Sequence, residues 1–197
     1  MKNLKRLAPV FIVLVLAIVV VLVLRATPRP RPVSTPTPAQ DVESWRVYQN
    51  QEYGFELRYP PDWELRQEMD STNPIEQQII TLTSPLVQQS QQQGIPGTPI
   101  ADISISVRRA FSLEQLDQEL QEQVLESGYN FIVNKRLTKI NGYKASVMTI
   151  GGYGAELNIY FPNAGNLYHF LFSQTATLQE LTWTENLILS TFRFLDN

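Results

Sequence analysis

A single histidine, His169, limits the catalytic and metal chemistry open to this chain of 197 residues. One histidine cannot form a histidine cluster for a metal, and a Ser-His-acid triad would have to be built around this residue alone. His169 alternates with Leu167 and Leu171 in a segment whose pattern is typical of a strand. The alternation favours a structural histidine with satisfied hydrogen bonds over a catalytic one.

Two groups of carboxylates could do chemistry without histidine. Asp62 lies close to Glu64, and Glu114, Asp117 and Glu119 share a segment with helical periodicity. Such groups can bind Ca²⁺ or serve as the acid pair of a glycosidase. Acids on a solvated helix face are the commoner case, and a hydrolase that uses carboxylates alone stays open as the alternative.

Three glycines, Gly151, Gly152 and Gly154, superficially resemble a phosphate-binding loop. No Lys-Ser pair and no strand-to-helix transition follows them, so a hairpin connection is the better interpretation. The sequence therefore predicts no phosphate site and no bound cofactor.

Aromatic residues near the start of the domain could form a platform for carbohydrate. Tyr53, Tyr59 and Trp63 are the candidates. Aromatic side chains in opening strands more often fill the core, which is what we expect here.

The absence of cysteine excludes a further set of functions. Disulfides, thiolate catalysis, iron–sulfur clusters, cysteine-ligated zinc and a lipid-modified cysteine anchor all require this residue. The chain also has no Asn-x-Ser/Thr sequon. Both absences fit a bacterial protein.

Charge is distributed unevenly along the chain. Six of the sixteen basic residues flank an apolar segment near the N-terminus, whereas all nineteen acids come later. From Asp41 onward ten basic residues stand against nineteen acidic ones, a net charge of −9. An acidic domain lacks the basic surface that displaces counterions from phosphates, so nucleic acid is excluded as a partner.

The segment 7–24 consists of eighteen consecutive uncharged residues and predicts a transmembrane helix of roughly 27 Å. A cleaved signal peptide is the alternative, but the apolar run is long and the following VLRATPRP is a poor cleavage site. Three basic residues lie on each side, and the short basic tail 1–6 is the easier end to retain in the cytoplasm. We therefore expect a single-pass cell-membrane protein with its soluble domain, 41–197, on the extracytoplasmic side.

Between helix and domain lies a proline-rich linker, 25–40. Its core, Thr27 to Pro38, alternates proline with small or basic residues and favours extended polyproline II. A second irregular stretch, Pro85 to Pro99, is rich in glutamine and carries proline and glycine. The sequence predicts a mobile loop there.

Alternation of apolar and polar residues predicts strands through most of the domain. The opening segment contains two strands around a turn near Asn50 to Gly54, and later strands form an antiparallel meander with a tight Asn141-Gly142 turn. A helix begins at Ser112, which forms a capping box with Gln115, and it ends near Gly128. A second helix runs from about Leu178 to Ser190. Further strand segments are 78–84, 101–109, 129–138, 143–150, 155–161, 167–173 and 191–194.

The segment YQNQEYGFELRYPPDWE resembles the N-terminal signature of PsbP-like domains, and ENLILSTFRF resembles their final helix and strand. The resemblance covers about Ser44 to Phe194 and implies an α+β fold, an antiparallel sheet of about six or seven strands flanked by helices as an α/β/α sandwich. It says little about activity, and photosystem function is not carried over. The signature positions are Tyr48, Tyr53, Gly54, Phe55, Tyr59, Pro60 and Trp63.

These observations favour a binding or assembly module without catalytic activity, tethered to the membrane and facing an envelope protein partner. The alternative is a carboxylate-based hydrolase acting on cell-envelope glycans. We expect Gly54, Phe55 and Trp63 to be structural, because they lie where a turn leads into a strand that needs a core anchor.

Overall fold

The computed structural model describes residues 42–67, 76–127, 131–151 and 155–195. The chain divides into two units, Met1–Gln40 and Asp41–Asn197, and all described residues belong to the second. The predicted tail 1–6, transmembrane helix 7–24 and linker 25–40 lie outside the described residues. Among the residues that are described, no helix is long and apolar enough to cross a membrane.

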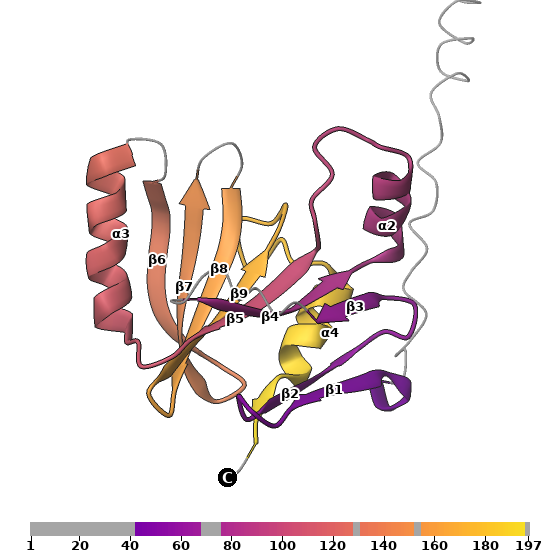
Figure 1. Ribbon diagram of the computed structural model, residues 1–197, viewed down its shortest axis with the longest axis horizontal. Coiled ribbons are helices and arrows are strands. Elements are labelled where there is room, and N and C mark those ends of the chain that lie inside the picture. The colour runs from indigo at the N-terminus through magenta and orange to yellow at the C-terminus, as the bar shows by residue number, and fades with distance from the viewer. Residues whose placement is uncertain (1–41, 68–75, 128–130, 152–154, 196–197) are drawn as a thin grey trace, which may run out of the picture. The chain divides into compact units, whose positions relative to one another are not determined.

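Seven antiparallel strands form the main sheet, which confirms the predicted α+β class and strand number (Figure 1). The meander β6-β7-β8-β9 makes up one half, and β9 pairs with β5 to join the other half. In sheet order the strands are β3 (Glu64–Gln67), β4 (Gln77–Thr83), β5 (Ile103–Arg108), β9 (Asn166–Phe172), β8 (Ala155–Asn163), β7 (Tyr143–Gly151) and β6 (Phe131–Ile140).

The two opening strands belong to a second sheet that the sequence does not predict. A 3₁₀ turn (Val42–Ser44) precedes β1 (Arg46–Asn50), which pairs with β2 (Phe55–Tyr59). The C-terminal β10 (Arg193–Phe194) completes this three-stranded sheet on the other side of β2. The separation arises because β2 pairs with the end of the chain and not with the next strand.

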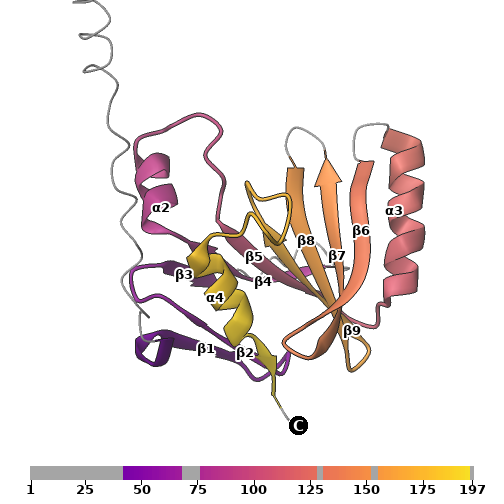
Figure 2. The same cartoon turned by 180° about the vertical axis from the view of Figure 1, so that it is seen from behind.

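Helices cover both faces of the large sheet. α3 (Leu113–Ser127) packs Leu113 and Leu116 on one face, and α4 (Trp183–Thr191) belongs to the larger core on the other. Figure 2 shows α4 next to β1 and β2, with α3 at the far side of the sheet next to β6. This arrangement agrees with the sandwich that the resemblance implies.

The predicted helix start at Ser112 is confirmed. The Gln115 amide donates to Ser112 Oγ over 3.2 Å, and the Ser112 amide donates to Gln115 Oε1 over 2.9 Å. The second predicted helix is correct in kind, but it begins at Trp183 and not near Leu178. Thr182 forms a capping box with Glu185 and thereby fixes the later start.

The loop predicted over Pro85 to Pro99 is wrong in its first half, which is helix α2 (Pro85–Gln92). Ser84 caps this helix by accepting a hydrogen bond from the Val87 amide, and Pro85 occupies the first turn, where its missing N–H is harmless. The Ser-Pro pair therefore outweighs the irregular composition of the segment.

The aromatic residues of the opening segment are core residues, as the sequence predicts. Phe55 is fully buried, and Tyr53, Tyr59 and Trp63 are also buried. The Tyr168 hydroxyl donates to the Tyr53 carbonyl over 2.6 Å. A carbohydrate platform formed by these aromatics is thereby contradicted.

Candidate functional site

The sheet register brings His169 into a polar cluster on the face that also carries α3. Ser106 on β5 lies directly opposite His169 on β9, and Tyr160 on β8 lies opposite it on the other side. Asn158 is two residues from Tyr160 and so shares its face. Glu76, just before β4, completes the cluster.

Both ring nitrogens of His169 have partners. Nδ1 lies 3.0 Å from Oε1 of Glu76 and 3.4 Å from Oγ of Ser106. Nε2 lies 2.8 Å from Oδ1 of Asn158, whose Nδ2 donates to a backbone carbonyl. The Tyr160 ring stacks on the imidazole with centroids 4.4 Å apart. The hydrogen bonds expected of a satisfied histidine are therefore present.

Glu76 is held in its ionised form. Burial alone would raise its pKa, but the hydrogen bond and charge of His169, a hydrogen bond donated by Ser106 and the charge of Arg108 together lower the pKa to about 2. Burial raises the pKa of the neighbouring Tyr160 hydroxyl. The cluster therefore combines a carboxylate that is ionised at neutral pH with groups that hold it in place.

Arg108 anchors the same face next to the cluster. Its side chain is buried, its Nη2 donates to Glu119 of α3 over 2.6 Å, and its guanidinium carbon lies 3.5 Å from the centre of the Phe111 ring. On the other flank of α3, Lys135 forms an ion pair with Asp117. The two ion pairs join α3 to β5 and to β6.

Two members of the polar cluster, Glu76 and His169, line a cleft of about 890 Å³. Its lining comes from strands β4, β5, β8 and β9 and from the loop 97–101. Gln91 of α2 holds this loop, because its Nε2 donates to the carbonyls of Pro99 and Ile100 over 2.8 Å each. Polar lining residues include Glu76, Gln78, Thr98, Ser104, Glu156 and Ser173.

The geometry of the cluster is unlike that of a nucleophilic triad. In a triad the serine contacts one histidine nitrogen and the acid contacts the other. Here Ser106 and Glu76 share Nδ1, Ser106 donates its proton to Glu76, and Nε2 faces Asn158. The histidine therefore has no free nitrogen with which to activate Ser106.

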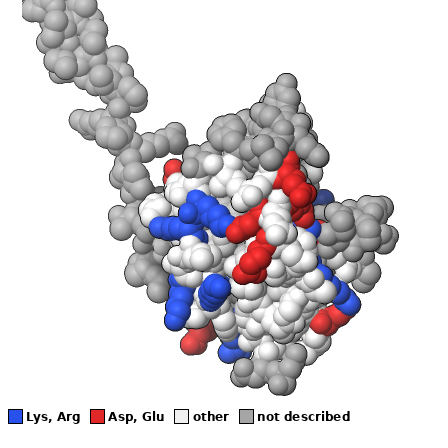
Figure 3. Space-filling view, turned by 90° about the vertical axis from the view of Figure 1, so that its left-hand side faces the viewer, with Lys and Arg blue, Asp and Glu red and all other residues white. Residues whose placement is uncertain are grey.

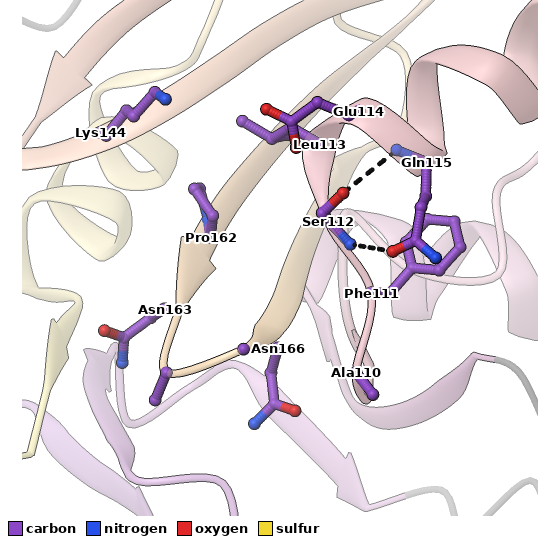
Figure 4. A pocket seen from close by; sticks show the side chains of 12 residues that line it. Ala110, Phe111, Ser112, Leu113, Glu114, Gln115, Lys144, Pro162, Asn163 and Asn166 are labelled. Carbon is purple, nitrogen blue, oxygen red and sulfur yellow. Dashed lines mark hydrogen bonds between the residues drawn. The ribbon is translucent and has the colours of Figure 1, made fainter.

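A smaller pocket of about 390 Å³ lies at the start of α3, near the turn between β8 and β9 (Figure 4). Ser112 and Gln115 are engaged with each other there. Hydrogen bonds from its own backbone and from Ser112 lower the pKa of Glu114. Because the Glu114 carboxylate already occupies the start of α3, this pocket is a weaker candidate for a functional site than the cleft.

The acids singled out in the sequence do not form a site. Asp62 is exposed, and Glu64 is hydrogen-bonded to Arg66. Asp117 and Glu119 are used in the two ion pairs of α3. Across the described ranges, no three His, Asp or Glu side chains could jointly hold a metal ion.

Gly151 pairs with Ala155 at the end of the β7–β8 hairpin, as the hairpin interpretation predicts. Gly152 and Gly154 lie outside the described residues. The sequence did not single out Glu76, Ser106, Asn158 or Glu156, because nothing in their local pattern distinguishes them from ordinary polar residues of half-buried strands.

No family model matches the chain, and no curated protein matches it. Among solved structures, the chain is similar to the solution structure of cyanobacterial PsbP from Synechocystis sp. PCC 6803. The sequences are 14% identical, the match covers 83% of this chain and 99% of that one, and the TM-score is 0.48.

A second similar structure is a crystal structure from Bacteroides thetaiotaomicron VPI-5482, with 10% identity and a TM-score of 0.42. The match covers 77% of this chain but 49% of that one, about half of its length.

Proposed function

We propose that this protein is a membrane-tethered, extracytoplasmic binding module whose cleft receives part of an envelope protein. The observation that carries the proposal is the cleft itself. Its lining offers many hydrogen-bonding groups, while both nitrogens of His169, which is part of the lining, are already occupied. Such a surface can hold a ligand without activating a nucleophile.

The lining of the cleft suits a polar segment of a protein. Hydroxyl and amide groups of Ser104, Thr98 and Gln78 can exchange hydrogen bonds with a backbone. Ile100, which is 81% exposed, and the half-buried Leu171 supply apolar contact at the same place. This mixture of apolar and polar groups is typical of ligand sites.

The predicted N-terminal helix and proline-rich linker support the tethered part of the proposal. The short basic tail stays in the cytoplasm while the acidic domain follows the helix across. Protease added to intact cells, after any outer barrier is permeabilised, should remove the domain. Full protection with a sealed inner membrane would place the domain in the cytoplasm instead.

A carboxylate-based hydrolase of cell-envelope glycans is the second candidate, and one observation favours it. Glu76 and Glu156 line the same cleft. A glycosidase needs one ionised carboxylate and one protonated acid with a raised pKa. The lowered pKa of Glu76 suits the first role, so Glu156 would have to act as the acid.

The two proposed functions, binding module and hydrolase, predict different results in an activity assay. The purified chain should show no turnover on peptidoglycan, glycosides, esters and peptides, and Glu76→Gln, Glu156→Gln and His169→Gln should change nothing. Robust turnover that disappears when one of these side chains is replaced would overturn the binding proposal.

Binding is tested by filling the cleft. Crosslinking in intact cells should capture a defined envelope protein with the native chain and lose it with Ser104→Tyr, since Ser104 lines the cleft. The matched control is Ser190→Tyr, an exposed position on α4. Equal capture by both variants would show that the partner does not use the cleft.

A further inference from the structure

Positive charge in the domain is concentrated in one hairpin. Residues 127–155 hold four basic and no acidic side chains, whereas the rest of the chain from Asp41 holds six basic and nineteen acidic ones. The basic residues are Lys135, Arg136, Lys139 and Lys144, all on β6 and β7. Figure 3, which views the side of the domain that carries α3, shows a group of basic side chains directly beside a group of acidic ones.

This hairpin contains the edge of the large sheet. Within the described part of the chain, β6 is bonded to β7 on one side and to no strand on the other. A register shift between Ile132 and Asn134 ends its first part, and regular pairing runs from Asn134 to Ile140. The open edge is therefore a regularly paired segment long enough to pair with another strand.

The hairpin turn determines which backbone groups of β6 face outward. Asn141 and Gly142 both have positive φ, as in a two-residue hairpin whose closing pair, here Ile140 with Tyr143, is hydrogen-bonded. Hydrogen-bonded and non-hydrogen-bonded pairs alternate along an antiparallel ladder. The backbone N–H and C=O groups of Lys139, Leu137 and Lys135 consequently point to the open edge.

The side chains of these three residues share one face. Lys139 lies directly opposite Lys144, at a non-hydrogen-bonded position where side chains come closest. Like charges placed in this way are destabilising. Lys135 forms an ion pair with Asp117. Among the described residues no direct ion pair joins Lys139 or Lys144 to an acid, and the nearest compensation is Glu114 of α3, whose lowered pKa owes a minor part to the charge of Lys144. Between the lysines, Leu137 is 63% exposed.

We propose that the open edge of β6 receives an extended acidic segment of a partner protein as an additional strand. A Glu or Asp opposite Lys139 would neutralise the Lys139–Lys144 pair, and an apolar side chain opposite Leu137 would cover that residue. Backbone hydrogen bonds to the outward groups supply affinity, and the alternating side chains supply specificity. This surface is separate from the cleft.

Edge lysines have another established use, which is to prevent edge strands from pairing with one another. The two roles make opposite predictions for neutral variants. If the lysines only protect the edge, Lys139→Gln with Lys144→Gln should cause self-association of the chain. If they recognise an acidic strand, the same change should weaken binding of that strand and leave the oligomeric state unchanged.

The test uses the full-length chain and a short synthetic peptide with the repeat Glu-Thr-Val-Thr, so that Glu and Val alternate along one face of the strand and Thr lies on the other. The native chain should bind this peptide in a salt-dependent manner and ignore a peptide with Lys in place of Glu. Charge reversal by Lys139→Glu with Lys144→Glu should weaken binding about tenfold. Arg136→Glu, on the opposite face of β6, is the matched control and should have little effect.

A proline variant separates strand addition from simple charge attraction. Leu137→Pro removes an outward N–H but no bond to β7, so the fold should survive while peptide binding is lost. Leu137→Ala is its control and retains binding. Circular dichroism checks the fold of each variant. If the proline variant unfolds, the charge variants decide whether the edge of β6 binds the peptide.

Three results would overturn the proposal. The first is equal weakening by Arg136→Glu, which would indicate unspecific attraction. The second is self-association of the neutral double variant. The third is binding to vesicles rich in phosphatidylglycerol, with the same dependence on Lys139 and Lys144, by a chain that ignores the peptide.

Discussion

His169 and Glu76 are 93 positions apart in the chain, yet Nδ1 of the imidazole lies 3.0 Å from Oε1 of the carboxylate. The contact joins β9 to the residue that leads into β4, across the intervening strand β5. It sets the charge at the edge of the cleft and ties together strands that are distant in sequence.

This contact predicts how stability depends on pH. The folded pKa of Glu76, about 2, lies below its ordinary value of 4.5, so its stabilising contribution is present above about pH 4.5 and is lost as the pH falls toward 2. Glu76→Gln should lower the free energy of unfolding at neutral pH by about 2 kcal/mol, and the difference from the native chain should vanish in acid. Urea unfolding at several pH values measures it, with exposed Glu156→Gln as the control.

The burial of Trp63 predicts that its truncation lowers the stability of the fold and does not act through the cleft. It is 7% exposed within the main core, so Trp63→Ala should cost about 3–5 kcal/mol. Trp183→Ala is a matched control, because Trp183 is 42% exposed and its removal should cost less than about 1 kcal/mol. Thermal unfolding distinguishes the two; unchanged melting of the Trp63 variant would contradict a core role.

The start of α4 offers a sharper test of local structure. The Glu185 amide donates to Thr182 Oγ1 over 3.2 Å, and the Thr182 amide donates to Glu185 Oε2 over 2.7 Å. Thr182→Ala should therefore cost about 1 kcal/mol, while Thr182→Ser should cost much less. Equal stability of the two variants in chemical denaturation would show that the cap contributes nothing.

Asn141 links the β6–β7 hairpin to the end of α4. Its Nδ2 donates to the carbonyls of Leu189 over 2.7 Å and Phe192 over 3.1 Å. Asn141→Gly keeps the positive φ but loses both bonds, at about 1–2 kcal/mol. Asn141→Asp should be more harmful, because it directs a carboxylate at two carbonyl oxygens. Calorimetric melting of the two variants should rank them in this order.

Much of the fold could be predicted because its signals are local. Alternation located the two opening strands, and the Ser112 capping box located the start of α3. The start of α4 was misplaced although Thr182 and Glu185 carry the same capping pattern. Composition alone does not predict α2, because its glutamines are typical of a loop and only the Ser84 cap with Pro85 marks the start of the helix.

The candidate site could not be predicted in this way. Ser106 contacts His169 only because β5 pairs with β9. A helix and three other strands separate these two strands in the sequence, and no local pattern predicts that they pair. Glu76 enters from yet another segment. Nothing in the immediate neighbourhood of these residues in the sequence sets them apart from solvated polar side chains.

The pairing of β10 with β2 also has a consequence for biosynthesis. Arg193 and Glu56, joined over 2.7 Å, are 137 positions apart, and Phe192 packs 5.9 Å from Phe55. Contacts that close so long a loop form late, because the chain entropy is lost before they contribute. The opening strands therefore stay incomplete on the ribosome until Arg193 and Phe194 have been translated, so a chain truncated before Phe192 should be degraded even though its seven-stranded sheet is encoded in full.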